Sequence, residues 1–431
     1  MSWSLLRAAP LRELAQDAEI STVNIAFVGC GFVFDIYMRT RNAHPELSIV
    51  GVFDIRRDRQ DQVCTYYGLA GYDSYEALLA DPKVDVVVNL TNISSHVPVT
   101  RQALEAGKHV YSEKPIATSR EECASLFDLA RRKRVHFSGA PCNIFSDSLR
   151  TLFASVKAGQ IGQPLLVYAE LDDNPIHVME FEKVRSPSGA PWPLVEEIHE
   201  GCTYEHVGYH LIWICALLGP AVNVTAFSKE LIADKSDQTS GFVGTPDYSV
   251  ACLNFENGAT ARITCSVVAP RDHRMRVIGR DGELSTEGYR HYRAPVFLER
   301  FTRAALSARK FRTVRNTPWL ARRFGVGGRS LPLVRNWKSH AVERHQQPGA
   351  SLKTRVIEWL RRREVYAQDK FVGIAELARS LKTGAPPYLT PEFLQHINEL
   401  TLMIQGAGPA GVAVKPATTF APLGDLTGTL S

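Results

Sequence analysis

The tripeptide Glu113-Lys114-Pro115 combines a carboxylate, an ammonium and a rigid ring at one point of the chain. It directly follows residues 109–112, whose pattern predicts a β-strand. Because α/β sheets bind ligands outside the carboxyl ends of their strands, the Lys114 ammonium is expected to face that crevice. There it can hydrogen-bond a substrate hydroxyl and stabilise the alkoxide that forms as a hydride leaves, with Glu113 holding it in place. On the tripeptide alone, a surface Lys–Glu pair before a turn proline is the simpler interpretation.

A glycine-rich turn, Gly29-Cys30-Gly31, lies between an expected strand at 23–28 and an expected helix. Gly29 would permit a tight turn, and Gly31 would let backbone N–H groups approach a pyrophosphate at the positive end of the helix dipole. Phe34 stands where a dinucleotide fingerprint has its third glycine, so the helix is expected to pack farther from the strand. The pattern predicts a dinucleotide site with contacts from Gly29, Gly31, Phe32 and Val33.

The residue that ends the second expected strand, Asp54, indicates which dinucleotide is preferred. It stands 23 residues after Gly31, where a carboxylate can accept both ribose hydroxyls of adenosine. The same charge would repel a 2′-phosphate, which favours NAD over NADP. Arg56 and Arg57 weaken this preference, because either guanidinium can pair with that phosphate, so NADP stays a second candidate.

Cys202, His206 and His210 recur at intervals of four along an expected helix over residues 203–218, so they share one face. Such a face can hold zinc, but no further cluster of ligands accompanies it, and isolated histidine pairs on helices are mostly not metal sites. We therefore predict no metal. From the residues alone, a core position is the simpler interpretation of either histidine.

The expected secondary structure that positions these residues differs between the first and the later part of the chain. Up to about residue 140, short apolar runs alternate with helical patterns, which predicts parallel strands joined by right-handed crossovers. Consecutive strand patterns separated by Gly and Asn turns then predict an antiparallel sheet, closed by helices at 366–381 and 391–404. We expect an α/β fold with a doubly wound parallel sheet at 20–145, an α+β domain at 146–405 and an irregular tail at 406–431.

The composition is that of a globular protein, with 431 residues of which 45% are hydrophobic and 22% charged. These values exclude collagen-like, low-complexity and wholly disordered chains. No uninterrupted apolar run approaches the roughly 20 residues that cross a bilayer. Charged residues interrupt residues 1–19, which predicts an amphipathic helix rather than a secretory signal and, with it, a cytoplasmic protein. None of the eight cysteines forms a C-x-x-C pair, so we expect reduced, mostly buried thiols.

The charge is uneven along the chain. Residues 289–365 hold 19 basic and four acidic residues, while the whole chain has a net charge of +5, which leaves the remainder at −10. A segment this basic would attract phosphates, an acidic polysaccharide or an anionic membrane surface. It contains no recognisable nucleic-acid-binding motif, so no nucleic acid partner is expected. A solvated insertion or an interface with an acidic partner explains it equally well.

These motifs together resemble the glucose–fructose oxidoreductase, inositol dehydrogenase and rhizopine-catabolism family, written Gfo/Idh/MocA. The residues that carry the resemblance are Gly29-Cys30-Gly31, Asp54, the run from Ala103 to Pro115, Gly159-Gln160-Ile161-Gly162, and the helix from Glu200 to His210. The matches extend over about 23–288 and resume at 366–405, and the basic insertion has no counterpart.

The resemblance implies a Rossmann domain followed by a domain with an open-faced, mostly antiparallel sheet. It also implies NAD(P)-dependent redox chemistry on a sugar, cyclitol or nucleotide-sugar, in a dimer or tetramer built through that sheet. The family loop over the nicotinamide maps to residues 91–96, where Thr91 and His96 match but Asn92 and Ile93 replace a Pro and an Asn. The further cofactor contacts that the resemblance implies are Glu113, Lys114 and Asn143.

The family helix of the second domain usually reads Asp-x-Gly-x-His. Aligned on Gly208 and His210, its aspartate position holds His206. The resemblance thus implies that His210 is the general base, since an imidazole pKa near ~6.5 suits proton transfer at neutral pH. His206 would orient the sugar in place of the aspartate. Lys114, His206 and His210 are therefore the expected catalytic residues.

The function expected from these residues is hydride transfer between NAD and a secondary hydroxyl or the matching ketone. Two alternatives remain open within the same fold. One is an NAD-dependent glycosidase that works through a 3-keto intermediate. The other is a dinucleotide-binding sensor or regulator without turnover.

Overall fold

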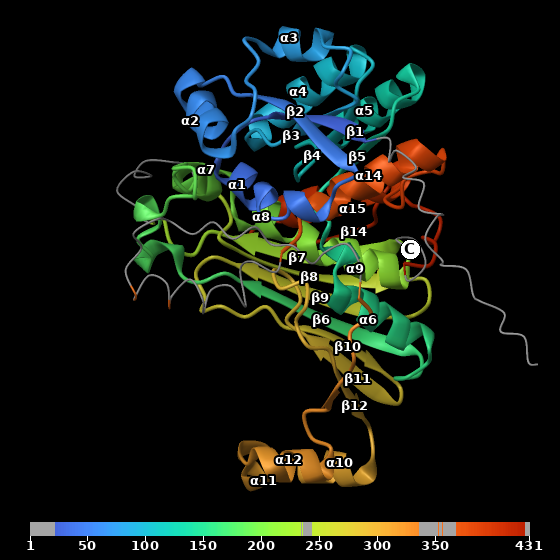
Figure 1. The fold of residues 1–431 in the computed structure, drawn as a ribbon. Coiled ribbons are helices and arrows are strands. Elements are labelled where there is room, and N and C mark those ends of the chain that lie inside the picture. The colour runs from blue at the N-terminus through green and yellow to red at the C-terminus, as the bar shows by residue number, and fades with distance from the viewer. Residues whose placement is uncertain are drawn as a thin grey trace, which may run out of the picture.

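The computed structural model describes residues 22–233, 235, 244–335, 352, 356 and 368–426. Two sheets dominate it, one above the other in Figure 1. Between them lie the helices α1 (Phe32–Met38), α8 (Cys202–His206), α14 (Phe371–Thr383) and α15 (Pro391–Gln405). The helix expected at 1–19 lies outside the described residues. Among the described helices, none combines the length and the apolar character that a membrane crossing demands.

The first sheet is fully parallel, in the order β2-β1-β3-β4-β5. Its strands are β1 (Val23–Val28), β2 (Leu47–Phe53), β3 (Val86–Asn89), β4 (His109–Ser112) and β5 (Phe137–Gly139). All four residues of β3 are buried, as expected for a strand covered on both faces. The helices along this stretch are α1 (Phe32–Met38), α2 (Arg57–Tyr67), α3 (Tyr75–Ala80), α4 (Ile93–Glu105) and α5 (Arg120–Lys133). The predicted doubly wound parallel sheet is confirmed.

Hydroxyl side chains set where several helices begin. Ser74, Ser119 and Ser146 each accept a hydrogen bond from the backbone N–H three residues later, at the start of α3, α5 and α6 (Asp147–Lys157). These bonds satisfy N–H groups that have no partner within the helix. The local sequence therefore fixes the entry points of the helices that frame the crevice.

A helix that is distant in sequence completes the first layer. Helix α14 (Phe371–Thr383) buries Phe371 in the cluster that also contains Phe27 and Tyr37, with 6.0 Å between the Phe27 and Phe371 ring centres. A Cβ on Gly373 would lie 2.3 Å from the Tyr111 hydroxyl, so only glycine permits this close approach. The chain thus returns to the first sheet after passing through the second.

The second sheet has nine strands in the order β13-β12-β11-β10-β6-β9-β8-β7-β14. Every pair is antiparallel except β6 and β9, so the mostly antiparallel sheet is confirmed. Its strands are β6 (Pro164–Asp172), β7 (Ala221–Lys229), β8 (Tyr248–Phe255), β9 (Thr260–Ser266), β10 (Met275–Gly279), β11 (Gly282–Thr286), β12 (Phe297–Arg300), β13 (Arg329–Ser330) and β14 (Val412–Val414).

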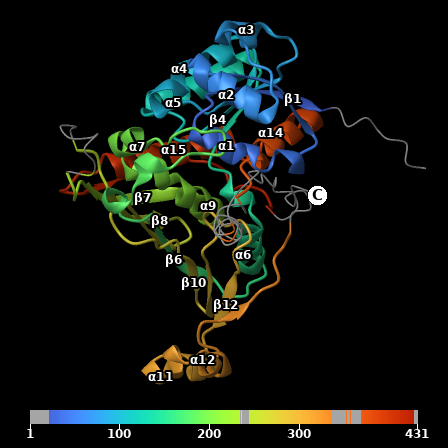
Figure 2. The ribbon, with the colours of Figure 1, turned by 60° about the vertical axis from the view of Figure 1, so that its left-hand side comes forward.

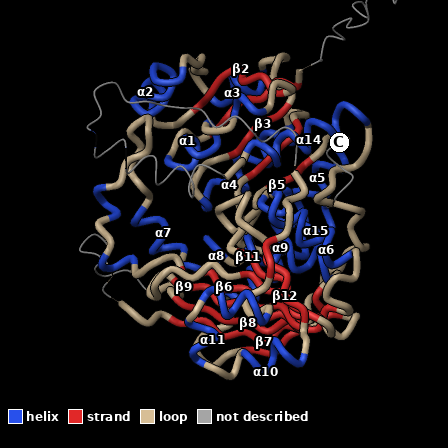
Figure 3. Tube along the Cα trace, turned by 60° about the horizontal axis from the view of Figure 1, so that its bottom comes forward, coloured by secondary structure: helices blue, strands red, loops and turns tan. Residues whose placement is uncertain are grey.

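In the part of the chain that the structure describes, the helices that pack on this sheet cover one of its faces. Alternate residues such as Val224, Leu253 and Ile263 are buried beneath the helices, while Thr225 and Cys252 on the opposite face are exposed. The helices of this part are α6 (Asp147–Lys157), α7 (Leu194–Glu200), α8 (Cys202–His206), α9 (Gly208–Leu218) and α15 (Pro391–Gln405). Figure 3 shows the strands as one layer with the far face uncovered by these helices.

Two expectations need correction. The tail was expected to be irregular, but residues 412–414 form β14 and pair with β7 at the sheet edge. The helix expected over 203–218 is broken at Val207 into α8 and α9.

The basic insertion also contributes structure, because β12 and β13 extend the sheet beyond β11. Between β12 and β13, α10 (Arg303–Ala308), α11 (Arg312–Asn316) and α12 (Pro318–Phe324) project from the body (Figures 1 and 2).

Candidate functional site

The turn between β1 and α1 has the geometry of a phosphate cradle. Gly29 has a φ of 92°, and a Cβ there would lie 2.7 Å from the carbonyl carbon of Leu90, so both conformation and space require glycine. Gly31 begins α1, and a Cβ on it would meet no atom within 4 Å. The helix N-terminus therefore faces open space, which leaves room for an anionic group beside its N–H groups.

Asp54 ties this turn to the end of β2. Its Oδ2 accepts a hydrogen bond of 2.7 Å from the Cys30 N–H, and its Oδ1 accepts one of 2.8 Å from the Arg56 N–H. The two arginines that follow are exposed and already paired with carboxylates. Arg56 pairs with Asp58, and Arg57 pairs with Asp61 and with Asp73.

A strap from the second domain, residues 184–191, is pinned beside the same turn. Asp35, fully buried on α1, accepts hydrogen bonds from the Ser186 hydroxyl and from the hydroxyl and the N–H of Ser188. Arg59 donates 2.6 Å from Nε to the Cys30 carbonyl and 2.8 Å from Nη1 to the Ser188 carbonyl. The buried Asp35–Arg59 pair thus connects the turn, α2 and the strap.

His96 holds the loop after β3 in place through both of its ring nitrogens. The imidazole is buried, with Nδ1 2.7 Å from the Pro115 carbonyl oxygen and Nε2 3.0 Å from the Thr91 carbonyl oxygen. Burial lowers the His96 pKa, so the neutral ring donates to one of these carbonyls. Thr91 in turn donates 2.7 Å from its hydroxyl to Asn89 Oδ1. His96 therefore positions the loop and the Glu-Lys-Pro segment relative to each other.

Glu113 is the centre of a buried polar network at the carboxyl end of β4. Its Oε1 accepts hydrogen bonds of 2.9 Å from the Tyr37 hydroxyl and 2.7 Å from Lys370 Nζ, and its Oε2 accepts 3.2 Å from the Lys114 N–H. Burial would raise the Glu113 pKa, but the Lys370 and Lys114 ammonium groups outweigh it and hold the pKa at about 2. Glu113 is therefore a permanent anion that joins α1, the Lys114 segment and the start of α14.

The Lys114 side chain reaches the second domain and forms an ion pair with Glu205 on α8. Burial would lower the Lys114 pKa, but the Glu205 carboxylate outweighs it and raises the pKa above its ordinary value. Lys114 therefore stays protonated. Its Nζ lies 5.8 Å from the ring centre of Tyr209, whose hydroxyl is 3.5 Å from Lys370 Nζ. Two cations and a phenol thus meet where α9 begins.

Beside this cluster, three basic side chains surround Asp173. The distances from its carboxylate oxygens are 3.5 Å to His206 Nε2, 3.3 Å to His273 Nε2 and 2.6 Å to Arg290 Nη2. Burial, against the opposing effect of Asp173, lowers the His206 pKa to about 4. His206 is therefore neutral at pH 7, and its Nδ1 is buried without a hydrogen-bond partner among the described residues.

His210, the expected general base, lies outside this cluster. Its side chain is fully buried: Nε2 is 2.9 Å from the Glu170 carbonyl oxygen, and Nδ1 accepts 3.1 Å from the Trp213 indole. Both nitrogens are therefore used within the core, and burial lowers the His210 pKa to about 4. The i, i+4 spacing is equally satisfied by Glu205 and Tyr209, and this is the pair that the fold turns toward Lys114.

Asn143 supports the site from behind. Its Nδ2 donates 3.0 Å to the Tyr209 carbonyl, and its side chain is fully buried. Cys202, the third residue of the face considered for zinc, points its Sγ toward the Cys265 carbonyl, 3.8 Å away. Among the described residues, no group of three or more His, Cys, Asp or Glu side chains is arranged so that it could bind a metal ion.

Sequence reasoning missed several residues of the crevice. Glu205 and Tyr209 had a detectable signal, because they lie four residues apart on the very helix that was considered. Lys370 had none, since it stands 257 residues after its partner Glu113. The same holds for Arg290, which reaches Asp173 from the segment after β11.

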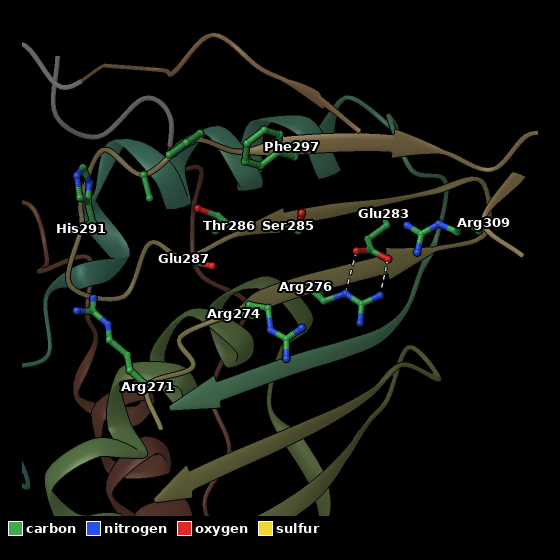
Figure 4. Close-up of a pocket in the computed structure, with 12 residues that line it drawn as sticks. Arg271, Arg274, Arg276, Glu283, Ser285, Thr286, Glu287, His291, Phe297 and Arg309 are labelled. Atoms are coloured by element: carbon green, nitrogen blue, oxygen red, sulfur yellow. Dashed lines mark hydrogen bonds and ion pairs between the residues drawn. The ribbon is translucent and has the colours of Figure 1, made fainter. Parts of the chain in front are cut away.

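A separate groove of about 610 Å³ lies on β10–β12 and the segment that follows β11 (Figure 4). Three of its four arginines, Arg274, Arg276 and Arg309, form ion pairs with carboxylates. Arg276 pairs with Glu283, and Arg274 pairs with Asp272.

Comparison with known proteins gives a family match for both parts of the chain. Residues 23–139 match the oxidoreductase family with an NAD-binding Rossmann fold, GFO_IDH_MocA. Residues 149–285 match the GFO/IDH/MocA C-terminal domain.

Relatives and solved structures agree with this match. The chain is 26% identical over 257 residues to the scyllo-inositol 2-dehydrogenase (NAD(+)) of Bacillus subtilis, covering 57% of this chain and 68% of that protein. A putative NADPH-dependent oxidoreductase from Desulfitobacterium hafniense superposes with a TM-score of 0.67 at 16% identity, covering 91% of this chain and 97% of the other. The WlbA dehydrogenase from Bordetella pertussis, in complex with NADH and UDP-GlcNAcA, gives 0.63 at 15% identity, with coverages of 92% and 98%. At these identities the structural matches establish a shared fold.

The core position of His210 predicts a specific pH dependence of stability. In the unfolded chain the imidazole binds a proton near its ordinary pKa of about 6.5, whereas the folded pKa is about 4. The folded state thus binds fewer protons, so its stability is complete above pH 6.5 and falls as the pH drops toward 4. At the lower end the loss would reach about 3 kcal/mol. His210→Gln, which keeps a donor for the Glu170 carbonyl, should show a smaller decrease in Tm than the wild type between pH 7 and pH 5.

His44→Gln is the matched control, because its sign is opposite. Hydrogen bonds to Asp369 and Glu46 outweigh the burial of His44 and raise its pKa to about 9. Its stabilisation is present below pH 6.5 and is lost as the pH rises through 9. Equal pH profiles for wild type and His210→Gln would show that His210 does not titrate as a core residue.

Proposed function

The chain belongs to the GFO/IDH/MocA oxidoreductase family, and on that basis we propose that it transfers a hydride between NAD and a secondary hydroxyl or ketone of a sugar, nucleotide-sugar or cyclitol. The observation that carries the proposal is the buried Lys114 ammonium, paired with Glu205 and next to Tyr209 at the carboxyl end of β4. Two domains contribute to this cluster, as a site between cofactor and substrate requires.

The residues of the first turn fit a nicotinamide dinucleotide. The open space over Gly31 accommodates a pyrophosphate, and the Asp54 carboxylate retains lone pairs for the adenosine ribose. The pairing of Arg56 and Arg57 with neighbouring carboxylates favours NAD, because it leaves these arginines less available to a 2′-phosphate. The bound nicotinamide supplies the acceptor or donor of the hydride.

Lys114 acts on the reacting oxygen as a fixed positive charge. Because its pKa is raised, it donates hydrogen bonds rather than removing a proton. An ammonium in a site with little water stabilises the negative charge that develops on the substrate oxygen as the C–H bond breaks. Glu205 holds the ammonium through an ion pair, and Glu113, which accepts a hydrogen bond from the Lys114 backbone N–H, adds a second negative charge nearby.

We assign the proton transfer to the Tyr209 hydroxyl. It lies beside the Lys370 ammonium, at 3.5 Å, and on the same side of the crevice as Lys114. In the reducing direction the Tyr209 phenol donates its proton to the ketone oxygen and becomes a phenolate beside the Lys370 ammonium; in the oxidising direction this phenolate accepts the proton of the substrate hydroxyl. Asn143 positions Tyr209 through its backbone carbonyl.

The surroundings favour a ligand rich in hydroxyl groups. Glu197, Glu205 and Asp173 supply acceptors, and the free Nδ1 of His206 adds a further polar contact. Burial, followed by the proximity of Glu205, raises the Glu197 pKa, so this carboxyl can donate as well as accept. His206 is thus a substrate-orienting residue in this proposal. A dimer or tetramer through the open face of the second sheet, where Leu166 is exposed, is part of the same proposal.

The first test is loss of activity at the two proposed groups. Lys114→Met and Tyr209→Phe should each lower kcat by about 10²-fold or more, because each removes a group that acts on the reacting oxygen. His210→Gln should stay within about threefold of the wild type, since the core rather than the crevice holds this residue. Activity is measured as NADH absorbance across a panel of sugars, nucleotide-sugars and inositols.

The outcomes separate this proposal from its alternatives. Near-normal turnover in Lys114→Met, or a loss in His210→Gln larger than in Tyr209→Phe, would contradict the assignment. Release of free sugar from a glycoside without accumulation of NADH would identify a glycosidase. Tight NAD binding without turnover on the whole panel would identify a sensor.

The strap predicts a second effect, on cofactor exchange. Ser186→Ala combined with Ser188→Ala removes two hydroxyl donors from Asp35 and leaves the Asp35–Arg59 pair in place. The strap should open more often, and NADH should dissociate at least about threefold faster, since each charge-assisted hydrogen bond contributes about 1.5–3 kcal/mol. Stopped-flow fluorescence of NADH measures this rate. An unchanged rate relative to Ser307→Ala, an exposed control far from the strap, would show that the strap does not retain the cofactor.

A further inference from the structure

We propose that the lobe formed by residues 302–330 docks this protein on an anionic lipid surface. The lobe contains α10, α11 and α12 and projects from the end of the second sheet opposite the parallel sheet (Figures 1 and 2). None of its residues belongs to the crevice around Lys114, so the proposal is independent of the catalytic assignment.

The lobe is cationic throughout. It holds eight basic residues and no acidic residue. Arg309 alone is neutralised, by an ion pair with Glu299. The other seven are exposed, and none of them forms an ion pair with a residue in the described part of the chain; they are Arg303, Lys310, Arg312, Arg315, Arg322, Arg323 and Arg329. Unpaired cations gathered on one projection attract an anionic surface strongly and lose little by leaving their present environment.

Large apolar side chains stand among these cations. Trp319 is 68% exposed and Phe311 63%, and Leu306 and Phe324 are 47% and 42% exposed. Within the three helices, only the small residues Ala305 and Ala308 are buried. The lobe therefore has almost no core of its own to hold these side chains. Segments that bind at a membrane interface combine Trp, Phe and Leu with Arg in this way, and they bury the apolar side chains at the level of the lipid headgroups.

The lobe is fixed to the body rather than trailing from it. Glu299 on β12 is buried and receives Arg309 Nε at 2.7 Å and the Gly327 N–H at 2.6 Å. These contacts join the beginning and the end of the lobe to one carboxylate. The strands β12 and β13 pair beside it, with Leu298 opposite Arg329. A fixed lobe presents its cations and aromatic side chains together, without the entropy cost of ordering them on binding.

The charge of the rest of the molecule favours the same orientation. Outside residues 302–330 the chain carries a net charge of −3, because the whole chain has +5 and the lobe +8, so an anionic surface attracts the lobe and not the body. The lobe would then contact the surface first, with the Rossmann domain directed away from it (Figure 1). A nucleic acid would satisfy the cations, but its phosphate backbone offers no apolar environment to Phe311 or Leu306. Lipid satisfies both kinds of side chain, which is why we choose it.

The experiment is co-sedimentation of the full-length protein with vesicles. Binding to vesicles of 70% phosphatidylcholine and 30% phosphatidylglycerol should exceed binding to pure phosphatidylcholine by at least about tenfold, and 0.5 M salt should reduce it. Arg312→Glu with Arg322→Glu and Arg323→Glu should abolish the difference. Phe311→Ser with Trp319→Ser should lower binding by about tenfold while leaving the charge unchanged.

The matched control has the same change in charge at another place. Lys83→Glu with Arg132→Glu and Lys133→Glu alters three exposed cations of the Rossmann domain and should bind vesicles as the wild type does. NADH binding by every variant verifies that it is folded. Equal binding by the lobe variant and the wild type, or an equal loss in the control, would overturn the proposal. Binding to duplex DNA or to polyglutamate as tight as to the vesicles, with no effect of the Phe311/Trp319 substitutions, would also overturn it.

Discussion

A single buried carboxylate at the end of β4 organises the crevice. Glu113 receives the Tyr37 hydroxyl from α1 and the Lys370 ammonium from the start of α14, and its own neighbour Lys114 extends into the second domain. Buried charges are tolerated only when they are paired and hydrogen-bonded. With Lys370 committed to Glu113, Lys114 takes Glu205 as its partner, so two lysines and two carboxylates balance each other. The buried Lys114 of the first domain therefore needs the Glu205 carboxylate of the second domain as its partner, and this pair holds the two domains together.

The same requirement explains which helix face looks into the crevice. Spacing of four residues places two side chains on one face, but it does not say where that face points. The break at Val207 separates α8 from α9, and Glu205 and Tyr209 turn toward the lysines while His210 enters the core beside Trp213. A neutral imidazole between a carbonyl and an indole suits a dry core, whereas a phenol beside two ammonium groups suits a site for proton transfer.

Two regions outside the crevice, the groove on β10–β12 and the lobe of residues 302–330, differ in how far their basic side chains are paired with carboxylates. Three of the four arginines around the groove on β10–β12 are matched with carboxylates, as Arg276 is with Glu283, whereas seven of the eight basic residues of the lobe have no such partner among the described residues. Matched pairs stabilise a surface in water and contribute little to binding. Unmatched cations beside exposed aromatic side chains indicate contact with something else, and the anchoring of the lobe by Glu299 makes that contact a property of the fold.

The sequence by itself determined the features that depend on neighbouring residues. The Gly29 turn, Asp54 at the end of β2, Lys114 at the end of β4 and the change from parallel to antiparallel strands all follow local patterns of period and turn chemistry. Only the tertiary structure decided the rest: that Tyr209 rather than His210 faces Lys114, that Lys370 returns to Glu113, and that residues 412–414 close the sheet edge. The physical reason is range. The spacing of residues along the chain determines which helix or strand they form. Which side chains pair across the crevice depends on how segments distant in sequence pack together, and there the need to pair buried charges outweighs local preferences.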